Sequence, residues 1–195
     1  PEAMTARRHA EQRAAAAALG VEDVRFLGER DGHLEASHTV RRALVRLMRQ
    51  VRPDVVLSTH PERDWERMQR AHPDHLECGE AVVRAAYPAV ENPYAYPELR
   101  EDEGLEPHRI RNLLLYGGPR RLENLALDVT GLEETKLAAL DAHLSQHPDV
   151  EAMRRFVRRQ LAETHAAHAA QASGMGAAEA FHLVTVNGPD TIAGF

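Results

Sequence analysis

Helix-like and strand-like patterns of apolar residues alternate along most of the chain. Residues 5–19 are rich in alanine and arginine and stop at Gly20, which predicts a helix. After Ser37, residues 38–51 carry apolar side chains three and four positions apart, which predicts a second helix with one buried face. Further helices are predicted from Pro73 onward and over 131–146 and 149–170.

Short apolar runs between these helices predict strands. The run at 54–59 is continuous, as is typical of a parallel strand that is covered on both faces. The other predicted strands span 21–27, 110–116, 125–129 and 181–186, and residues 88–108 are expected to form a long surface loop. This alternation of helix and strand predicts an α/β sheet with crossover helices.

Length and composition favour one globular α/β domain over 1–195, since the chain is short for two domains. The net charge of −6 argues against a nucleic-acid binder, which needs a positive face. The longest apolar stretch is too short to span a bilayer, and no secretory leader opens the chain. A single cysteine, Cys78, is interpreted as a buried free thiol in a reducing compartment, so we expect a cytoplasmic protein.

The segment His72-Pro73-Asp74-His75 is the strongest candidate for chemistry. It follows a predicted strand and loop, and loops beyond the carboxyl ends of parallel strands are where open α/β sheets bind ligands. Pro73 at the first helical position would place His72 at the cap and His75 in the first turn, where both imidazoles can converge. Asp74 is favoured by the helix N-terminus and is expected to orient an imidazole.

Spacing alone does not select this pair of histidines. With twelve histidines in the chain, chance gives roughly one His-x-x-His pair, and His165 and His168 repeat the spacing in a helix that is expected to be exposed. A catalytic zinc also takes three protein ligands as a rule, and the motif offers two at most. Asp54, Glu62 and Asp64 are candidate carboxylate ligands, and their spacing selects none of them.

Several short segments, in the same order along the chain, resemble the LmbE-like (PIG-L) deacetylase family. The ordered set covers about residues 1–186 and includes the segments at 7–15 with 19–21, 26–28 with 31–34, 52–56, 72–75, 136–140 with 143–146, and 178–181. The resemblance implies a Rossmann-like α/β fold, with a mostly parallel sheet and helices on both faces. It further implies a zinc-dependent hydrolase that removes the N-acetyl group from a substrate containing N-acetylglucosamine.

The resemblance also assigns roles to individual residues. It implies that His75 binds the metal and that His72, supported by Asp74, protonates the leaving amine or stabilises the oxyanion. Arg8 and Asp31 stand where relatives contact the sugar; the alternatives are a surface charge and a turn former. Arg70 stands where some relatives place a tyrosine for the oxyanion, and an arginine can stabilise negative charge there.

One family feature is missing from the sequence. The family carries an earlier His-Pro-Asp-Asp motif that supplies two zinc ligands and a general base, and these 195 residues contain no such motif. The match begins at the family's second helix, and the chain starts at Pro1 without methionine. We therefore expect a chain that lacks the first β-α-β unit, with the rest of the zinc site upstream; the alternative is a degenerate homologue without metal.

Three other functions stay open at this point. The first is a thiol-conjugate amidase of the same family, which cleaves a larger acyl group. The second is a non-catalytic sugar-binding remnant. The third, a nucleotide-binding domain, is weaker because no glycine-rich turn follows the first strand. The expected partner is a small amino-sugar molecule, without nucleic acid or membrane; the sequence leaves the sugar and any homo-oligomer undetermined.

Overall fold

The computed structural model describes residues 2–170 and 176–188. The chain divides into two compact units, one built from residues 1–26 and 126–180 and the other from residues 27–125 and 181–195. Each unit has a hydrophobic core of its own. None of the helices within the described residues is long and apolar enough to cross a membrane.

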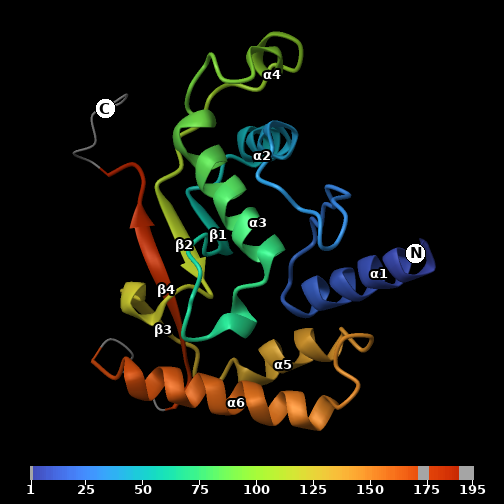
Figure 1. Cartoon of the computed structure of the whole chain (residues 1–195), viewed down its shortest axis with the longest axis vertical. Coiled ribbons are helices and arrows are strands. Elements are labelled where there is room, and N and C mark those ends of the chain that lie inside the picture. The colour runs from blue at the N-terminus through green and yellow to red at the C-terminus, as the bar shows by residue number, and fades with distance from the viewer. Residues whose placement is uncertain (1, 171–175, 189–195) are drawn as a thin grey trace. The chain divides into compact units, whose positions relative to one another are not determined.

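The unit formed by residues 27–125 and 181–195 carries the helices and strands around the His72–His75 segment (Figure 1). Ser37 caps its first helix, because the side-chain Oγ accepts a hydrogen bond from the Val40 N–H at 3.2 Å. The main elements are α2 (His38–Val51), β1 (Val55–Thr59), α3 (Pro73–Arg84) and β2 (Asn112–Tyr116). Shorter helices are η1 (Met68–Arg70), η2 (Ala85–Ala89), α4 (Pro97–Glu101) and η3 (Arg120–Leu122).

The sheet contains four strands in the order β1-β2-β4-β3, with β3 at Leu125–Asp128 and β4 at Ala178–Thr185. β1 pairs with β2 in parallel, from Val55 opposite Asn112 to Thr59 opposite Tyr116. β4 runs antiparallel to β2, so the sheet is mixed. The α/β class predicted from the alternating pattern is confirmed, and the carboxyl ends of β1 and β2 lie at one common edge.

The core of this unit lies between α2, α3 and the strands. Val45, Leu99 and Ile110 are fully buried in it, and burial of each such side chain contributes about 1.5–3 kcal/mol. The covering of β1 is one-sided, however, because Val55 is 46% and Leu57 is 59% exposed. The prediction that both faces of this strand are covered is therefore wrong for the described residues, among which β1 is an edge strand.

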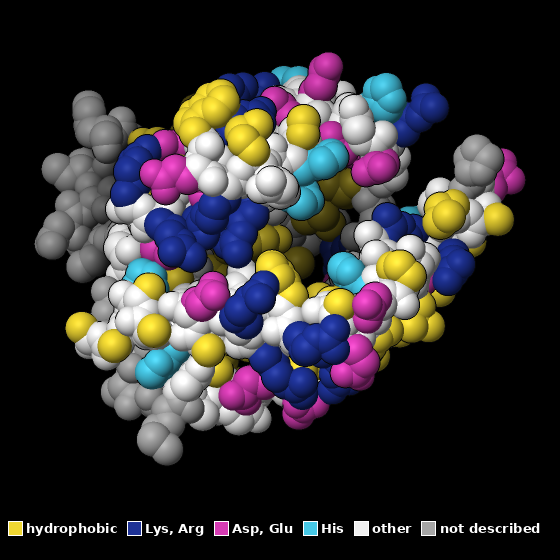
Figure 2. All heavy atoms as spheres, turned by 60° about the horizontal axis from the view of Figure 1, so that its bottom comes forward, with side chains coloured by type: hydrophobic (Ala, Val, Ile, Leu, Met, Phe, Trp, Pro, Cys, Tyr) yellow, Lys and Arg dark blue, Asp and Glu magenta, His cyan; other side chains and the backbone are white. Residues whose placement is uncertain are grey.

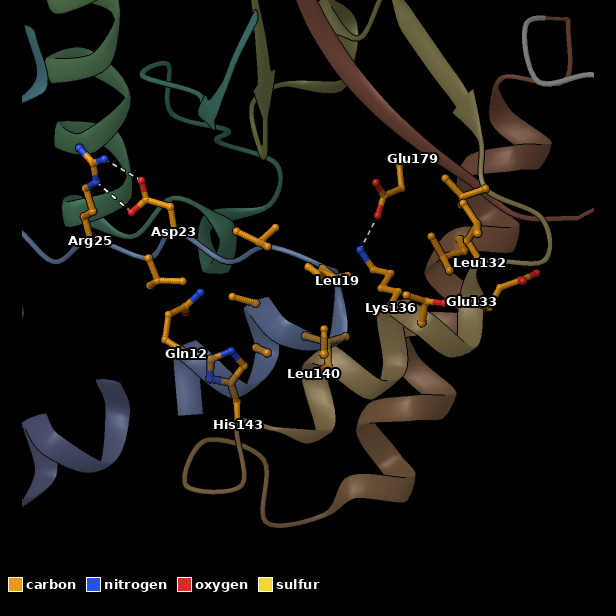
Figure 3. Close-up of a pocket in the computed structure, with 18 residues that line it drawn as sticks. Gln12, Leu19, Asp23, Arg25, Leu132, Glu133, Lys136, Leu140, His143 and Glu179 are labelled. Atoms are coloured by element: carbon orange, nitrogen blue, oxygen red, sulfur yellow. Dashed lines mark hydrogen bonds and ion pairs between the residues drawn. The ribbon is translucent and has the colours of Figure 1, made fainter. Parts of the chain in front are cut away.

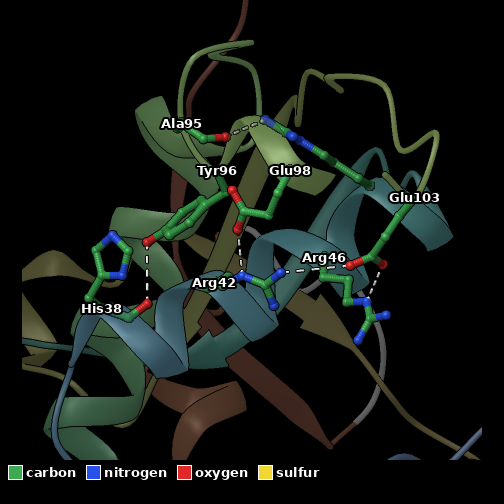
Figure 4. A network of polar contacts seen from close by, with 8 residues as sticks. His38, Arg42, Arg46, Ala95, Tyr96, Glu98 and Glu103 are labelled. Carbon is green, nitrogen blue, oxygen red and sulfur yellow. Dashed lines mark hydrogen bonds and ion pairs between the residues drawn. The ribbon is translucent and has the colours of Figure 1, made fainter. Parts of the chain in front are cut away.

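The segment 88–108 is more ordered than the predicted loop. It contains α4, and Figure 4 shows its side chains engaged with α2: Arg42 pairs with Glu98 at 2.6 Å, and Arg46 pairs with Glu103 at 2.5 Å. Arg49, which is 2% exposed, donates hydrogen bonds to four backbone carbonyls of this segment. These hydrogen bonds compensate the cost of burying the Arg49 guanidinium, and they hold residues 88–108 against α2.

The other unit is mainly helical, with α1 (Glu2–Ala18), α5 (Glu133–Asp141) and α6 (Val150–Ala167). Its core contains Leu137, Val157, Leu161 and Ala177. Glu11 on α1 accepts hydrogen bonds from both the backbone N–H and the hydroxyl of Ser145, at 2.9 and 2.6 Å. The strand predicted at 21–27 is absent: these residues follow α1 as an irregular segment, and Val21 is 49% exposed.

Candidate active site

The His72–His75 segment begins α3, as the sequence predicts. His72 is the N-cap and Pro73 occupies the first turn. The Asp74 N–H donates to His72 Nδ1 at 3.2 Å, so the neutral imidazole carries its proton on Nε2. The ring centroids of His72 and His75 lie 5.4 Å apart, and both side chains are exposed. The structure therefore places two imidazoles side by side at the positive end of a helix.

Asp74 holds the preceding loop against this helix. Its Oδ2 accepts a hydrogen bond from the Gly32 N–H at 2.6 Å, and Glu77 accepts one from the Ala36 N–H at 2.7 Å. Gly32 has a φ of +78°, a conformation that glycine adopts without strain. The turn that contains Asp31 is thereby fixed next to the start of α3. The carboxylate of Asp74, which was expected to orient an imidazole, thus contacts a backbone amide.

The start of α3 is also fastened to the carboxyl end of β1. The Thr59 hydroxyl donates to the backbone oxygen of His75 at 2.6 Å. One turn further on, α3 approaches the strand so closely that a Cβ on Gly79 would lie 2.5 Å from the backbone carbonyl oxygen of Thr59. Helix and strand meet here backbone to backbone, at the sheet edge where α/β proteins bind ligands.

A second pair of histidines, which the sequence did not single out, lies in the same unit, one directly after β1 and the other on β4. His60 follows β1 directly, is 6% exposed, and lies with its Nε2 3.0 Å from Nδ1 of His182 on β4. Its Nδ1 accepts from the Glu62 N–H at 2.9 Å, so the Nε2 proton is donated to His182. Burial, followed by the charge of His182, lowers the pKa of His60. The position of His60 directly after a predicted parallel strand is the one sequence signal that could have indicated it as a site residue.

The loops after β1 and β2 are joined by an arginine. Arg67 pairs with the buried Asp64 at 2.5 Å and donates to the Gly118 carbonyl at 2.9 Å. The pKa of Asp64 is lowered, because its hydrogen bonds with Arg67 and the Glu66 amide outweigh the effect of burial. Arg70, half-buried at the end of η1, has its pKa lowered by burial and then by the charges of Arg67 and Arg120.

The described residues do not complete a metal site. They contain no group of three or more His, Cys, Asp or Glu side chains that could hold an ion. Two of the candidate carboxylate ligands are engaged elsewhere, since Asp64 pairs with Arg67 and Glu62 pairs with Arg121. His75 and His72 thus offer at most two ligands among the described residues.

Four of the predicted site residues come together around the start of α3, namely Asp31, His72, Asp74 and His75, and Arg70 precedes them on η1. Arg8 lies on α1 in the other unit and is half-buried. Its Nη1 has no hydrogen-bond partner among the described residues. Its role in sugar binding stays a prediction.

A separate cavity of about 710 Å³ lies within the mainly helical unit (Figure 3). Its wall is largely apolar, and four of its charged side chains form two pairs: Lys136 pairs with Glu179, and Arg25 pairs with Asp23 at 2.7 Å. A fifth, Glu133, accepts a hydrogen bond from the Gly131 N–H at 2.6 Å. The segment at His72–His75 contributes nothing to its lining. On chemical grounds the start of α3 is therefore the better candidate for catalysis.

Comparisons with known proteins agree on one family. Residues 1–86 match the family described as PIG-L, GlcNAc-PI de-N-acetylase. The chain is 32% identical over 149 residues to the diacetylchitobiose deacetylase of Thermococcus kodakarensis, covering 73% of this chain and 51% of that protein. It is 31% identical over 132 residues to a probable N-acetyl-alpha-D-glucosaminyl L-malate deacetylase 2 of Bacillus anthracis, covering 64% and 55%.

The structural comparison points the same way. The fold is similar to that of the N,N'-diacetylchitobiose deacetylase from Pyrococcus horikoshii, with a TM-score of 0.75 and 27% identity over 92% of this chain and 64% of that one. The chain spans about half the length of the curated relatives it matches. Together with the motif at the start of α3, these likenesses show that the chain belongs to the PIG-L, or LmbE-like, family.

Proposed function

We propose that this chain carries part of the active site of a metal-dependent amide hydrolase, which removes the N-acetyl group from a substrate containing N-acetylglucosamine. The observation that supports this most directly is the pair of imidazoles of His72 and His75 at the start of α3, held at the carboxyl edge of the sheet. Relatives named as deacetylases of acetylated amino sugars agree with it.

His72 has the arrangement expected of a proton donor. Its Nδ1 is occupied by the Asp74 N–H, which leaves Nε2–H pointing away from the helix cap. From there it would donate to the developing oxyanion or to the departing amine, and such general acid–base help contributes about 10²- to 10⁴-fold in rate. Asp74 acts as a positioning residue, because it holds both the cap and the turn of Asp31.

His75 is the proposed zinc ligand of this chain. The described residues do not fit a zinc ion by themselves, so the remaining ligands would come from outside them. Asp31, Arg8 and Arg70 are proposed to contact the substrate. We further propose a cytoplasmic location and a small amino-sugar substrate as the partner, with neither nucleic acid nor membrane.

A non-catalytic sugar-binding protein is the second candidate. It is favoured by the lack of a three-ligand metal group among the described residues. The two are separated by measuring the metal content of the intact protein and its release of acetate from an N-acetylglucosaminide. Near-stoichiometric zinc, with acetate release that stops on chelation and returns with zinc, is expected. A protein free of metal that releases no acetate would leave the binding role.

The same assay separates the deacetylase from a thiol-conjugate amidase. An N-acetyl sugar and an analogue with a bulky acyl group are compared at equal concentration. We expect the N-acetyl substrate to react faster, and a preference for the bulky acyl group would assign the amidase.

A further inference from the structure

The segment 87–98 carries two tyrosines whose rings are exposed to solvent. Many charged side chains of the surface satisfy one another: Lys and Arg lie beside Asp and Glu on the face shown in Figure 2, and Arg154 pairs with Glu134 at 2.7 Å. Tyr94, by contrast, is 86% exposed and Tyr87 is 42% exposed, although aromatic rings normally bury most of their area. The described residues leave the apolar faces of these rings uncovered.

Both rings line a pocket of about 510 Å³ that belongs wholly to the unit of residues 27–125 and 181–195. Its wall comes from the start of α2, the end of α3 and the segment 87–98, and none of the residues 72–75 contributes to it. Aromatic and proline side chains share this wall with polar ones, among them Tyr87, Pro88, Tyr94, Pro97, Arg41 and Asn92. The pocket is therefore a second concave site, separate from the start of α3.

The turn that carries the rings is held in place from inside the protein. The buried Arg49 donates to the Asn92 carbonyl at 2.8 Å, and the Asn92 side chain accepts the Tyr94 N–H at 2.9 Å. Tyr96, which also lines the pocket, is 9% exposed, and its hydroxyl donates to the His38 carbonyl at 3.4 Å (Figure 4). Its φ of +56° is unfavourable for so large a residue and persists only where the surroundings impose it. The pocket is thus preformed.

The polar groups of the pocket offer hydrogen bonds with little uncompensated charge. Two charged side chains are balanced by partners outside the lining, in the pairs of Arg84 with Glu80 and of Glu98 with Arg42, each at 2.6 Å. The Nη groups of Arg41 and the Nδ2 group of Asn92 have no hydrogen-bond partner among the described residues. These two side chains therefore present planar N–H donors beside the exposed rings.

This combination fits one class of ligand. A pyranose ring has C–H faces that pack on an aromatic ring, and hydroxyl groups around its edge that accept hydrogen bonds from amide and guanidinium donors. We propose that the pocket binds a neutral oligosaccharide, with Tyr87 and Tyr94 against the faces of its rings and with Arg41 and Asn92 on its hydroxyls. No acetyl group takes part in this recognition, so the inference goes beyond the proposed function.

The test titrates cellotriose, a neutral trisaccharide without acetamido groups, into the intact protein by calorimetry. Wild type is expected to bind it. Tyr94→Ala, Tyr87→Ala and Arg41→Ala should each weaken binding by about 3- to 10-fold, because each removes one contact with the sugar. Tyr94→Phe and Tyr87→Phe keep the rings and should stay within about twofold of wild type.

The matched control is Phe156→Ala, which removes a 50% exposed aromatic ring from α6 in the other unit and should leave binding unchanged. Thermal unfolding shows whether each variant is folded, and Tyr94→Ala should be, since that side chain is so exposed. Absence of binding by wild type would overturn the inference. Equal binding by wild type and by both tyrosine-to-alanine variants would overturn it as well.

A proline-rich peptide is titrated in parallel, because walls of tyrosine and proline also suit such a chain. Binding of this peptide in place of cellotriose would overturn the assignment to a sugar and make the pocket a peptide groove. Binding of cellotriose alone is the expected result.

His72→Ala separates this inference from the proposed function. The variant is expected to lose acetate release and to bind cellotriose as wild type does. A wild type that releases no acetate but binds cellotriose through Tyr94 would contradict the proposed function and support the pocket. Acetate release without any binding of cellotriose would contradict the pocket alone.

Discussion

Two His-x-x-His pairs with identical spacing lie at opposite ends of their helices. His72 caps the N-terminus of α3 and accepts a backbone N–H on its ring nitrogen. His168 is the C-cap of α6, and its backbone N–H donates to the carbonyls of Thr164 and His165 at 3.1 and 3.2 Å. The second pair was expected on an exposed face, and its side chains are half-buried.

The difference lies in what each helix end offers. A helix N-terminus presents unpaired N–H groups and a partial positive charge, which fix a neutral imidazole and attract an oxyanion. A C-terminus presents carbonyls, which offer nothing to a carbonyl-containing substrate. The first pair also lies at the carboxyl end of a parallel strand. The same three-residue spacing therefore has chemical meaning only at one helix end.

The largest expected effect is on catalysis. In the intact protein, His75→Ala should abolish acetate release, and His72→Ala should lower kcat by about 10²- to 10⁴-fold through loss of the proposed proton donor. His165→Ala and His168→Ala should each stay within about twofold of wild type. Equal losses in both pairs, measured by acetate release, would remove the distinction between them.

The close contact of α3 with β1 gives the next effect. A Cβ on Gly79 would lie 2.5 Å from the backbone carbonyl oxygen of Thr59, so Gly79→Ala must move the helix. We expect the free energy of unfolding in urea to fall by about 1–3 kcal/mol. Arg155→Ala on the exposed side of α6 should change it by no more than about 0.5 kcal/mol. A neutral Gly79→Ala would show that α3 is free to shift.

Capping substitutions separate structure from chemistry. Asp149 caps α6 by accepting the Ala152 N–H at 2.9 Å, so Asp149→Ala should cost about 1 kcal/mol of stability and leave kcat unchanged. His72→Asn keeps a capping side chain on α3, so its stability should stay close to wild type while kcat falls as in His72→Ala. If His72→Asn retained activity, the imidazole would be only a cap.

The smallest effect is the dependence of stability on pH. Because the pKa of folded His60 lies below its usual value of 6.5, the unfolded chain binds protons more readily. Stability should therefore be full above that value and decline as the pH falls below it. The charged neighbours that act on His60 are His182, Glu62 and Arg121. Urea unfolding at several pH values should show the decline in wild type and a weaker one in His60→Gln.

Local signals predicted the elements that carry the motif. Ser37, Pro73 and the apolar run at 54–59 each act within a few residues, and α2, α3 and β1 appear where these signals place them. The prediction of a strand at 21–27 was wrong because an apolar run forms a strand only with a neighbouring strand, and none pairs with it in the described part of the chain. The antiparallel direction of β4 likewise depends on a distant partner, β2.

The same distinction holds for the candidate site and for the buried Arg49 of α2. His72 and His75 were found from a short motif and its position after a strand. The contact between His60 and His182 joins residues 122 positions apart, and no sequence spacing indicates it. Arg49 was also missed, because its four carbonyl partners belong to a segment that is read from the sequence as a loop.

The edge position of β1 affects whether the 195 residues self-associate in solution. Val55 and Leu57 point their exposed side chains outward at alternate positions, on a strand that has no outer neighbour within the described residues. Such an edge is a template on which other strands add, and apolar side chains strengthen that association. Preparations limited to these residues should therefore self-associate with rising concentration, and a charged residue at position 57 should keep them dispersed.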